Sequence, residues 1–194
     1  MTLPDLPSER HRQVAGDFTA RVRGTGDWDV PSPVAGWAAR DVVRHLTEWF
    51  PGFLRDGAGV ELPTGPAVDQ DPVTAWRIHS DGVQAVLDDP ATDGRELSNP
   101  HIGTLPLATA IDRFYVADVF LHTWDLARAT GQDDRLDPEF CAEMFDGMQP
   151  LDEILRSSGQ YGPRVEVPAD ADAQTRLLGF IGRNPSWPNR PLLS

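Results

Sequence analysis

The segment from Leu107 to Thr130 constrains the fold most, because it has the pattern of one long amphipathic helix with ionisable residues on its apolar face. At 100° per residue, one narrow face collects Ile111, Tyr115, Asp118, His122, Asp125 and Ala129. Gly131 follows at the position where a helix commonly ends. An unpaired charge is expensive inside a core, so Asp118 and His122 must be paired, hydrogen-bonded or bound to a metal ion.

Helical periodicity also dominates the rest of the chain, interrupted by segments rich in proline and glycine. The pattern predicts further helices at about 7–23, from near residue 38 until the glycines at 57 and 59, at about 69–87 and at 138–148. Strand signals are nearly absent, and residues 88–100 read as a polar loop. We therefore expect an all-α fold with one domain over residues 1–194. It would be an antiparallel four-helix bundle with a short additional helix and an irregular C-terminal tail.

Length and charge limit the class of protein. The 194 residues suit one well-buried domain, and no window approaches the ~18 uninterrupted apolar residues of a membrane span. The first residues show neither a basic nor an apolar signal-peptide region, so we expect a cytoplasmic protein. The formal net charge of −13 argues against nucleic acid or an anionic membrane as a partner. A small molecule or another protein is the expected partner.

The chain also lacks the side chains that several enzyme classes need. All 17 basic residues are arginine, which excludes Schiff-base aldolases, pyridoxal phosphate enzymes and Walker-A nucleotidases, since each requires a lysine amine. Cys141 is the single cysteine, so no intramolecular disulfide and no cysteine-based zinc cluster can form. Any metal must be held by imidazole and carboxylate groups.

Asp118 and His122 have the spacing of two metal ligands on one helix. Residues four apart lie on adjacent turns, ~6 Å apart at Cβ, so the carboxylate and the imidazole can converge on one divalent ion. A stable site needs a third protein ligand, which must come from another helix. His45 is the best candidate, because it flanks the apolar stripe of the predicted second helix. The alternative is that Asp118 and His122 form a buried hydrogen-bonded pair without an ion, and that His45 is a half-buried helix residue.

Four other residues are weaker candidates for a role at such a site. His79 flanks the apolar stripe of the predicted third helix and is either a further ligand or a core or surface histidine. His101 either lines the mouth of a pocket or lies in solvent, and Asp125 either orients a ligand or pairs with an arginine. Cys141 has no base or positive charge nearby in the sequence, so we expect a buried structural cysteine rather than a nucleophile.

Three segments resemble the signature segments of the DinB-like metalloprotein superfamily. They are residues 30–46, residues 117–131, which include His122-Thr-Trp-Asp-Leu-Ala-Arg-Ala-Thr-Gly131, and residues 177–187. More narrowly, they are similar to the actinobacterial branch that includes mycothiol-dependent maleylpyruvate isomerases. The resemblance implies a four-helix bundle that holds a divalent metal, usually zinc or nickel. The implied ligands are His45, Asp118 and His122.

The resemblance also implies a function. We expect a metalloenzyme in which a low-molecular-weight thiol such as mycothiol fills the open position of the metal and attacks an electrophilic substrate as the thiolate. The outcome would be cis–trans isomerisation or thiol transfer. Two alternatives use the same residues: a non-catalytic metal-binding stress or sensor protein, and a hydrolase in which the metal activates water. An amphipathic bundle could also form a homodimer through an outer face.

Overall fold

The computed structural model describes residues 2–157, 159 and 161–188, and most of these residues are helical. The helices are α1 (Pro7–Gly24), α2 (Ala39–Ala58), α3 (Pro72–Asp88), α4 (Leu107–Ala110), α5 (Ala117–Thr130), α6 (Pro138–Met148), α7 (Asp152–Ser157) and α8 (Ala173–Phe180). The π-helical turn η2 (Ile111–Val116) joins α4 to α5, and 3-10 turns form η1 (Pro90–Thr92) and η3 (Gln149–Leu151). The strands β1 (Glu96–Asn99) and β2 (Gly103–Pro106) form a hairpin. The prediction of a mainly helical protein is confirmed.

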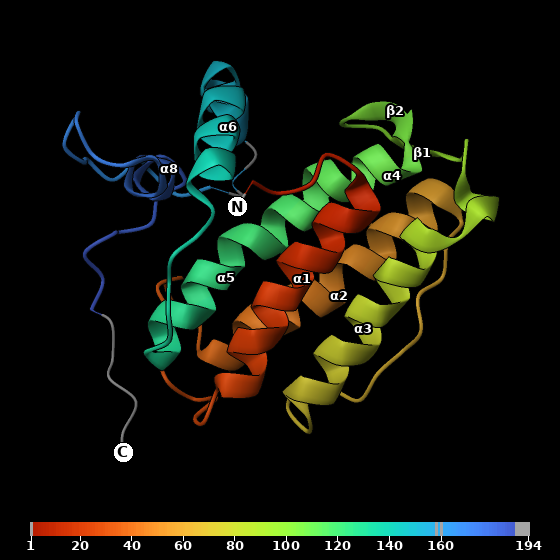
Figure 1. Cartoon of the computed structure of the whole chain (residues 1–194), viewed down its shortest axis with the longest axis horizontal. Helices are drawn as coiled ribbons and strands as arrows, with labels where there is room; N and C mark the ends of the chain where they lie inside the picture. Colours follow the sequence, from red (N-terminus) through yellow and green to blue (C-terminus); the bar gives the residue numbers. More distant parts are fainter. Residues whose placement is uncertain (1, 158, 160, 189–194) are drawn as a thin grey trace.

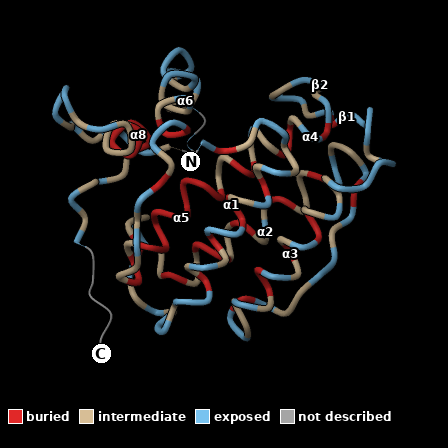
Figure 2. Tube along the Cα trace, viewed as in Figure 1, coloured by how far each residue is buried: buried red, intermediate tan, exposed pale blue. Residues whose placement is uncertain are grey.

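The long helices pack side by side around a common core. In Figure 1, α1 lies between α5 and α3 while α2 lies behind them, and α1 and α2 each contact both α3 and α5. Buried stretches run along the facing sides of these helices (Figure 2). Large side chains that are almost wholly buried fill the space between them, including Phe18, Leu46, Phe50, Trp76 and Trp124. Burial of each such side chain contributes ~1.5–3 kcal/mol to the stability of the fold. This packing holds in place the helices that carry the polar residues. No helix in the described part of the chain combines the length and apolar character needed to cross a membrane.

Short polar side chains and glycines fix the ends of the helices. Asp71 caps α3, because its carboxylate accepts a hydrogen bond from the Thr74 N–H at 2.9 Å. Gly59 and Gly131 follow α2 and α5 with left-handed φ values of 62° and 72°, which glycine adopts without strain. The predicted glycine terminators of these two helices are therefore confirmed at Gly59 and Gly131, whereas Gly57 lies inside α2.

The predicted helix over 107–130 is present, but it is not one regular α-helix. Residues 111–116 form the π-helical turn η2, whose wider hydrogen-bonded ring adds a residue to the turn. Beyond this turn, residues 119–127 of α5 are all buried. The expectation of a single narrow buried face is therefore wrong for α5. The reason is that α1, α2 and the C-terminal segment surround this helix.

The hairpin corrects the prediction that residues 88–100 form only a polar loop. β1 and β2 pair antiparallel, with Asn99 opposite Gly103 at the turn. Within the hairpin, Leu97 is the fully buried side chain, and it lies so close to α2 that a Cβ at Gly57 would come within 2.8 Å of it. A four-residue strand with one inward side chain shows no clear alternation, which explains why the strands were missed.

The C-terminal tail is less irregular than predicted, because it contains α7 and α8. α8 packs against α6 and buries Leu177, Leu178 and Phe180. The carboxylate of Asp172 caps this helix by accepting a hydrogen bond from the Thr175 N–H at 2.8 Å. A helix of eight residues is too short to show its period clearly. Residues 189–194 of the predicted tail lie outside the described residues.

Candidate metal centre

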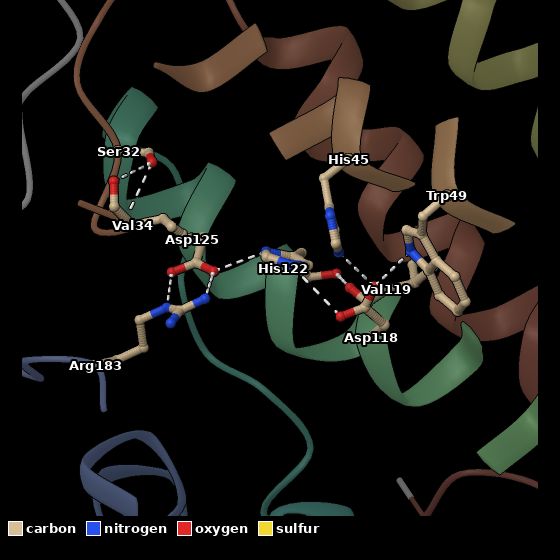
Figure 3. Close-up of polar contacts among 10 residues, drawn as sticks. Ser32, Val34, His45, Trp49, Asp118, Val119, His122, Asp125 and Arg183 are labelled. Atoms are coloured by element: carbon tan, nitrogen blue, oxygen red, sulfur yellow. Dashed lines mark hydrogen bonds and ion pairs between the residues drawn. The ribbon is translucent and has the colours of Figure 1, made fainter. Parts of the chain in front are cut away.

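Helices α2 and α5 bring the three predicted ligands together where they meet. His45 projects from α2, whereas Asp118 and His122 lie one turn apart on α5 (Figure 3). One ligand atom from each side chain lies within 4.8 Å of the other two. Folding therefore gathers two imidazole nitrogens and a carboxylate oxygen, a donor set that suits zinc or nickel.

Each imidazole has a nitrogen near a different oxygen of Asp118, at a distance close to that between two ligands of one small divalent ion. His45 Nε2 lies 3.0 Å from Asp118 Oδ2, and His122 Nε2 lies 3.5 Å from Asp118 Oδ1. Two ligands of a tetrahedral zinc ion, each ~2.0–2.1 Å from the metal, are ~3.3 Å apart. The residues therefore fit a divalent ion, and the binding of one stays a prediction. The same contacts also satisfy the alternative of a hydrogen-bonded cluster without an ion.

Asp125 and Arg183 orient His122 through its Nδ1 atom, on the side of the ring away from Asp118. The Nδ1–H of His122 donates to Asp125 Oδ2 at 2.9 Å, so Nε2 is the ring nitrogen that faces Asp118. Arg183 in turn donates from Nε and Nη2 to the two oxygens of Asp125 at 2.8 and 3.0 Å (Figure 3). Burial opposes ionisation of Asp125, but His122 and Arg183 outweigh it and hold its pKa below the ordinary value. Asp125 thus both holds a histidine and pairs with an arginine.

Asp118 has a further hydrogen-bond donor in Trp49. The indole N–H of Trp49, one turn after His45 on α2, donates to Asp118 Oδ2 at 3.0 Å. Burial acts to raise the pKa of Asp118, but the charge of His122 and the hydrogen bonds from His45 and Trp49 outweigh it and lower the pKa. The carboxylate is therefore ionised at neutral pH, as a metal ligand must be.

The indole of Trp37 covers one side of the two imidazoles. Its ring centroid lies 5.7 Å from that of His122, with the planes 19° apart, and 5.2 Å from that of His45. Backbone hydrogen bonds from the Ser32 N–H to the Trp37 carbonyl and from the Trp37 N–H to the Val34 carbonyl fix the loop that carries this indole. The aromatic contact restricts the orientation of both imidazole rings.

The three side chains differ in their access to solvent. The side chain of His122 is 6% exposed, whereas those of Asp118 and His45 are 24% and 33% exposed. Three protein ligands leave one position of a tetrahedral ion open. His45 and Asp118 therefore leave the group partly open to solvent.

The remaining candidates lie elsewhere in the structure. His79 is buried in the core on α3, in ring contact with Phe50 and Tyr115, and does not belong to the three-ligand group. His101 is exposed in the turn between β1 and β2. Cys141 is buried, and burial raises the pKa of its thiol to about 12, which agrees with a structural cysteine.

Sequence reasoning did not anticipate Trp37, Trp49 or Arg183 at the site. Trp49 follows His45 by four residues, so the spacing rule that connected Asp118 with His122 could also have identified it. Arg183 lies 58 residues from its partner in the sequence, and no local pattern links the two. Trp37 precedes α2 and reaches the site through a loop, which helical periodicity does not describe.

Comparison with known proteins finds relatives in Mycobacterium tuberculosis. The chain is 26% identical over 156 residues to Uncharacterized protein MT0763 of strain CDC 1551 / Oshkosh and to Uncharacterized protein Rv0738 of strain H37Rv. The match covers 79% of this chain and 83% of each relative. No protein family profile and no solved structure matches the chain. The names of the relatives state no activity, so the function has to be argued from the residues themselves.

Proposed function

We propose that this chain is a divalent-metal-binding protein of the DinB-like superfamily, in the branch that includes mycothiol-dependent maleylpyruvate isomerases. The observation that carries the proposal is the convergence of His45, Asp118 and His122, with ligand atoms within 4.8 Å of one another. All three residues lie in segments whose sequence resembles that superfamily. Zinc or nickel is the proposed ion, because both accept imidazole together with carboxylate.

The arrangement of the helices supports this assignment. α1 and α2 each contact both α3 and α5, so each of the four long helices packs against two of the others (Figure 1). The candidate ligands project from α2 and α5 toward each other (Figure 3). Metal sites in helical bundles are built in this way, from side chains on facing helices. We therefore interpret the four long helices as an antiparallel DinB-like bundle.

The hydrogen bonds behind His122 favour a metal ligand over a passive buried histidine. A histidine that binds a metal through Nε2 usually donates its Nδ1–H to a carboxylate or a carbonyl, and His122 makes this bond to Asp125. Arg183 fixes that carboxylate with two further hydrogen bonds. A buried pair without an ion would also need an acceptor for the Nδ1–H of His122, so what supports the metal ligand is that this acceptor is a carboxylate fixed by Arg183.

The proposed chemistry is activation of a low-molecular-weight thiol, such as mycothiol, for attack on an electrophilic substrate. A bound divalent ion lowers the pKa of the thiol, so that thiolate is present at neutral pH. His45, Asp118 and His122 would hold the ion. Trp49 and Asp125 orient two of these side chains, and the exposed flank beside His45 admits the thiol and the substrate. Addition, bond rotation and elimination would isomerise an unsaturated diacid, and a substrate with a reactive carbon would be conjugated.

Cobalt substitution tests the metal and the thiol separately. Protein loaded with Co²⁺ should show d–d absorption bands, and mycothiol or a simpler thiol at millimolar concentration should add a sulfur-to-metal charge-transfer band. Both signals should vanish in His122→Ala. They should persist in His101→Ala, a matched control that alters an exposed histidine in the hairpin turn.

Two results would count against the proposal at different levels. Cobalt bands that no thiol changes would remove the thiol chemistry, and a non-catalytic metal-binding protein or a hydrolase would then be the better explanation. Absence of cobalt bands in the unaltered protein would remove the metal site itself. The cluster would then be the hydrogen-bonded alternative without an ion.

A further inference from the structure

A second cluster of titratable side chains lies in the core, outside the three-ligand group. It consists of His11 on α1, His79 on α3 and Tyr115 on η2, which are 1%, 4% and 0% exposed. The ring centroid of Tyr115 lies 6.0 Å from that of His11 and 5.4 Å from that of His79. α1 contacts both α3 and η2, so the two imidazole rings lie beside Tyr115 where these elements pack together.

Each of these side chains has a buried polar atom without a hydrogen-bond partner among residues 2–157, 159 and 161–188. The atoms are His11 Nε2, His79 Nε2 and Tyr115 Oη. An unpaired buried donor or acceptor costs ~1–3 kcal/mol, and such atoms are rare in folded proteins. Three of them on rings whose centroids lie within 6.0 Å of that of Tyr115 indicate a common partner that the described side chains do not supply.

The hydrogen bonds of His11 specify what this partner must offer. Gln84 donates from Nε2 to the Ser8 carbonyl at 3.1 Å and to Asp88 Oδ1 at 3.0 Å, so its Oε1 is the atom that faces His11. That oxygen can only accept, and His11 Nδ1 lies 2.8 Å from it, so Nδ1 carries the proton. Burial lowers the pKa of His11, which keeps the ring neutral. His11 Nε2 is therefore a lone-pair acceptor that requires a donor.

The surroundings also require an uncharged partner. Burial lowers the pKa of His79 to about 4 and raises the pKa of Tyr115 well above its usual value, so both groups are neutral at pH 7. The charged groups that act on His11 are Arg12 and Asp88, which pair with each other at the surface. Asp118 acts on Tyr115 but has its own donors at the metal centre. A cation in the core cluster would thus lack a balancing carboxylate among the residues that the structure describes.

We propose that His11, His79 and Tyr115 form an internal binding site for one ordered water molecule. A water ~2.8 Å from each partner can bridge polar atoms up to ~5.6 Å apart. It would donate to His11 Nε2, accept from the Tyr115 hydroxyl and share its remaining hydrogen-bonding capacity with His79. Buried waters typically make about three such bonds. This water would tie α1 and α3 to η2, the turn that immediately precedes Asp118 and α5.

Nuclear magnetic resonance of protein labelled with ¹⁵N-histidine tests the site directly. We expect His11 in the Nδ1–H tautomer, and cross-peaks from its ring and the ring of His79 to a long-lived water. The exposed ring of His101 serves as the control, with contacts only to rapidly exchanging water. An Nε2–H tautomer at His11, or no long-lived water at either buried ring, would overturn the proposal.

A double-mutant cycle provides an independent test. Tyr115→Phe removes the hydroxyl and keeps the ring, which stacks on Phe50 at a centroid distance of 4.1 Å. If one water joins the residues, the combined effect of Tyr115→Phe and His79→Phe on the unfolding equilibrium constant should differ ~5-fold or more from the product of the single effects. If the effect of the double substitution on the unfolding equilibrium constant equals the product of the two single effects, a shared water would be contradicted. A bound metal equivalent that His79→Phe removes and His122→Ala does not would also overturn it, in favour of a cation.

Discussion

Two groups of histidines in this protein differ in what their nitrogens face. At the candidate metal centre, His45 and His122 face the carboxylates of Asp118 and Asp125, and one flank is open to solvent. In the core cluster, the histidines of α1 and α3 face an amide, a phenol and apolar rings, and solvent does not reach them. The first setting favours a cation, and the second favours a neutral ligand.

The two groups are neighbours along one helical run, since Tyr115 on η2 precedes Asp118 on α5 by three residues. The difference therefore comes from the helices that pack against this run, not from distance along the chain. α2 supplies a histidine and an indole donor near Asp118, whereas α1 and α3 supply neutral imidazoles near Tyr115. Substitutions in each group should have correspondingly different consequences.

The largest loss of stability is expected for Asp125→Ala. This change leaves the guanidinium of Arg183 without its carboxylate and removes the acceptor of His122. Breaking a buried ion pair on one side costs ~3–5 kcal/mol, and loss of the orienting bond should weaken metal binding by ~10–100-fold. Chemical denaturation and metal titration measure the two effects. Asp56→Ala, at an exposed aspartate, is the control and should change both quantities little. If Asp125→Ala changed them as little as the control does, the proposed role of Asp125 would be contradicted.

The core cluster should make the protein sensitive to acid. The folded state holds His79 with a pKa of about 4, whereas an unfolded histidine has a pKa near ~6.5. Between these values the unfolded chain binds more protons, so stability is fully present above pH ~6.5 and falls by ~3 kcal/mol as the pH drops to ~4. The free energy of unfolding, measured by chemical denaturation at several pH values between ~4 and ~6.5, should depend less on pH in His79→Gln. In His101→Gln it should depend on pH as steeply as in the unaltered protein. An equal pH dependence of the unfolding free energy in the unaltered protein and in His79→Gln would show that His79 does not cause the acid sensitivity.

A smaller effect is expected for Trp49→Phe at the metal centre. The substitution removes the indole N–H that donates to Asp118 and keeps an aromatic ring in its place. Loss of a hydrogen bond to a ligand typically weakens metal binding ~10-fold or more, with little change in stability. Competition with a chelator measures this affinity. Trp37→Phe keeps a ring against both imidazoles and should retain near-normal affinity, so an equal loss in both variants would point to packing rather than to the hydrogen bond.

The smallest effect is expected at the surface above the core cluster. Arg12 and Asp88, 56% and 44% exposed, form an ion pair there. Exposed pairs contribute ~0–1 kcal/mol, so Arg12→Ala should change the free energy of unfolding by less than ~0.5 kcal/mol. A loss as large as that from His79→Gln would show that the surface pair, and not the buried rings, governs this part of the fold.

Local patterns predicted the helices and the spacing of two candidate ligands well. The periods that identified residues 7–23, 69–87 and 138–148 correspond to α1, α3 and α6 within a few residues. The four-residue separation of Asp118 and His122 places them on adjacent turns of α5, as any continuous helix would. These features depend only on neighbours in the sequence.

Features that depend on tertiary contacts were harder to predict. Arg183 meets Asp125 across 58 residues, and Leu97 is buried only because α2 lies beside its strand. The π-turn before Asp118 has no signature in the apolar period. His11 is different, because it precedes Val14 by three residues and Phe18 by seven on the buried face of α1, so its burial could have been inferred.

Metal content tests the central proposal most directly. Purified protein should be incubated with Zn²⁺, dialysed and analysed for metal, beside His45→Ala, His122→Ala and the control His101→Ala. We predict about one tightly bound ion per chain in the unaltered protein and the control, and loss of that ion in both ligand variants. Full metal content in His45→Ala and His122→Ala, or no retained ion in the unaltered protein, would contradict the assignment of His45, Asp118 and His122 as a metal centre.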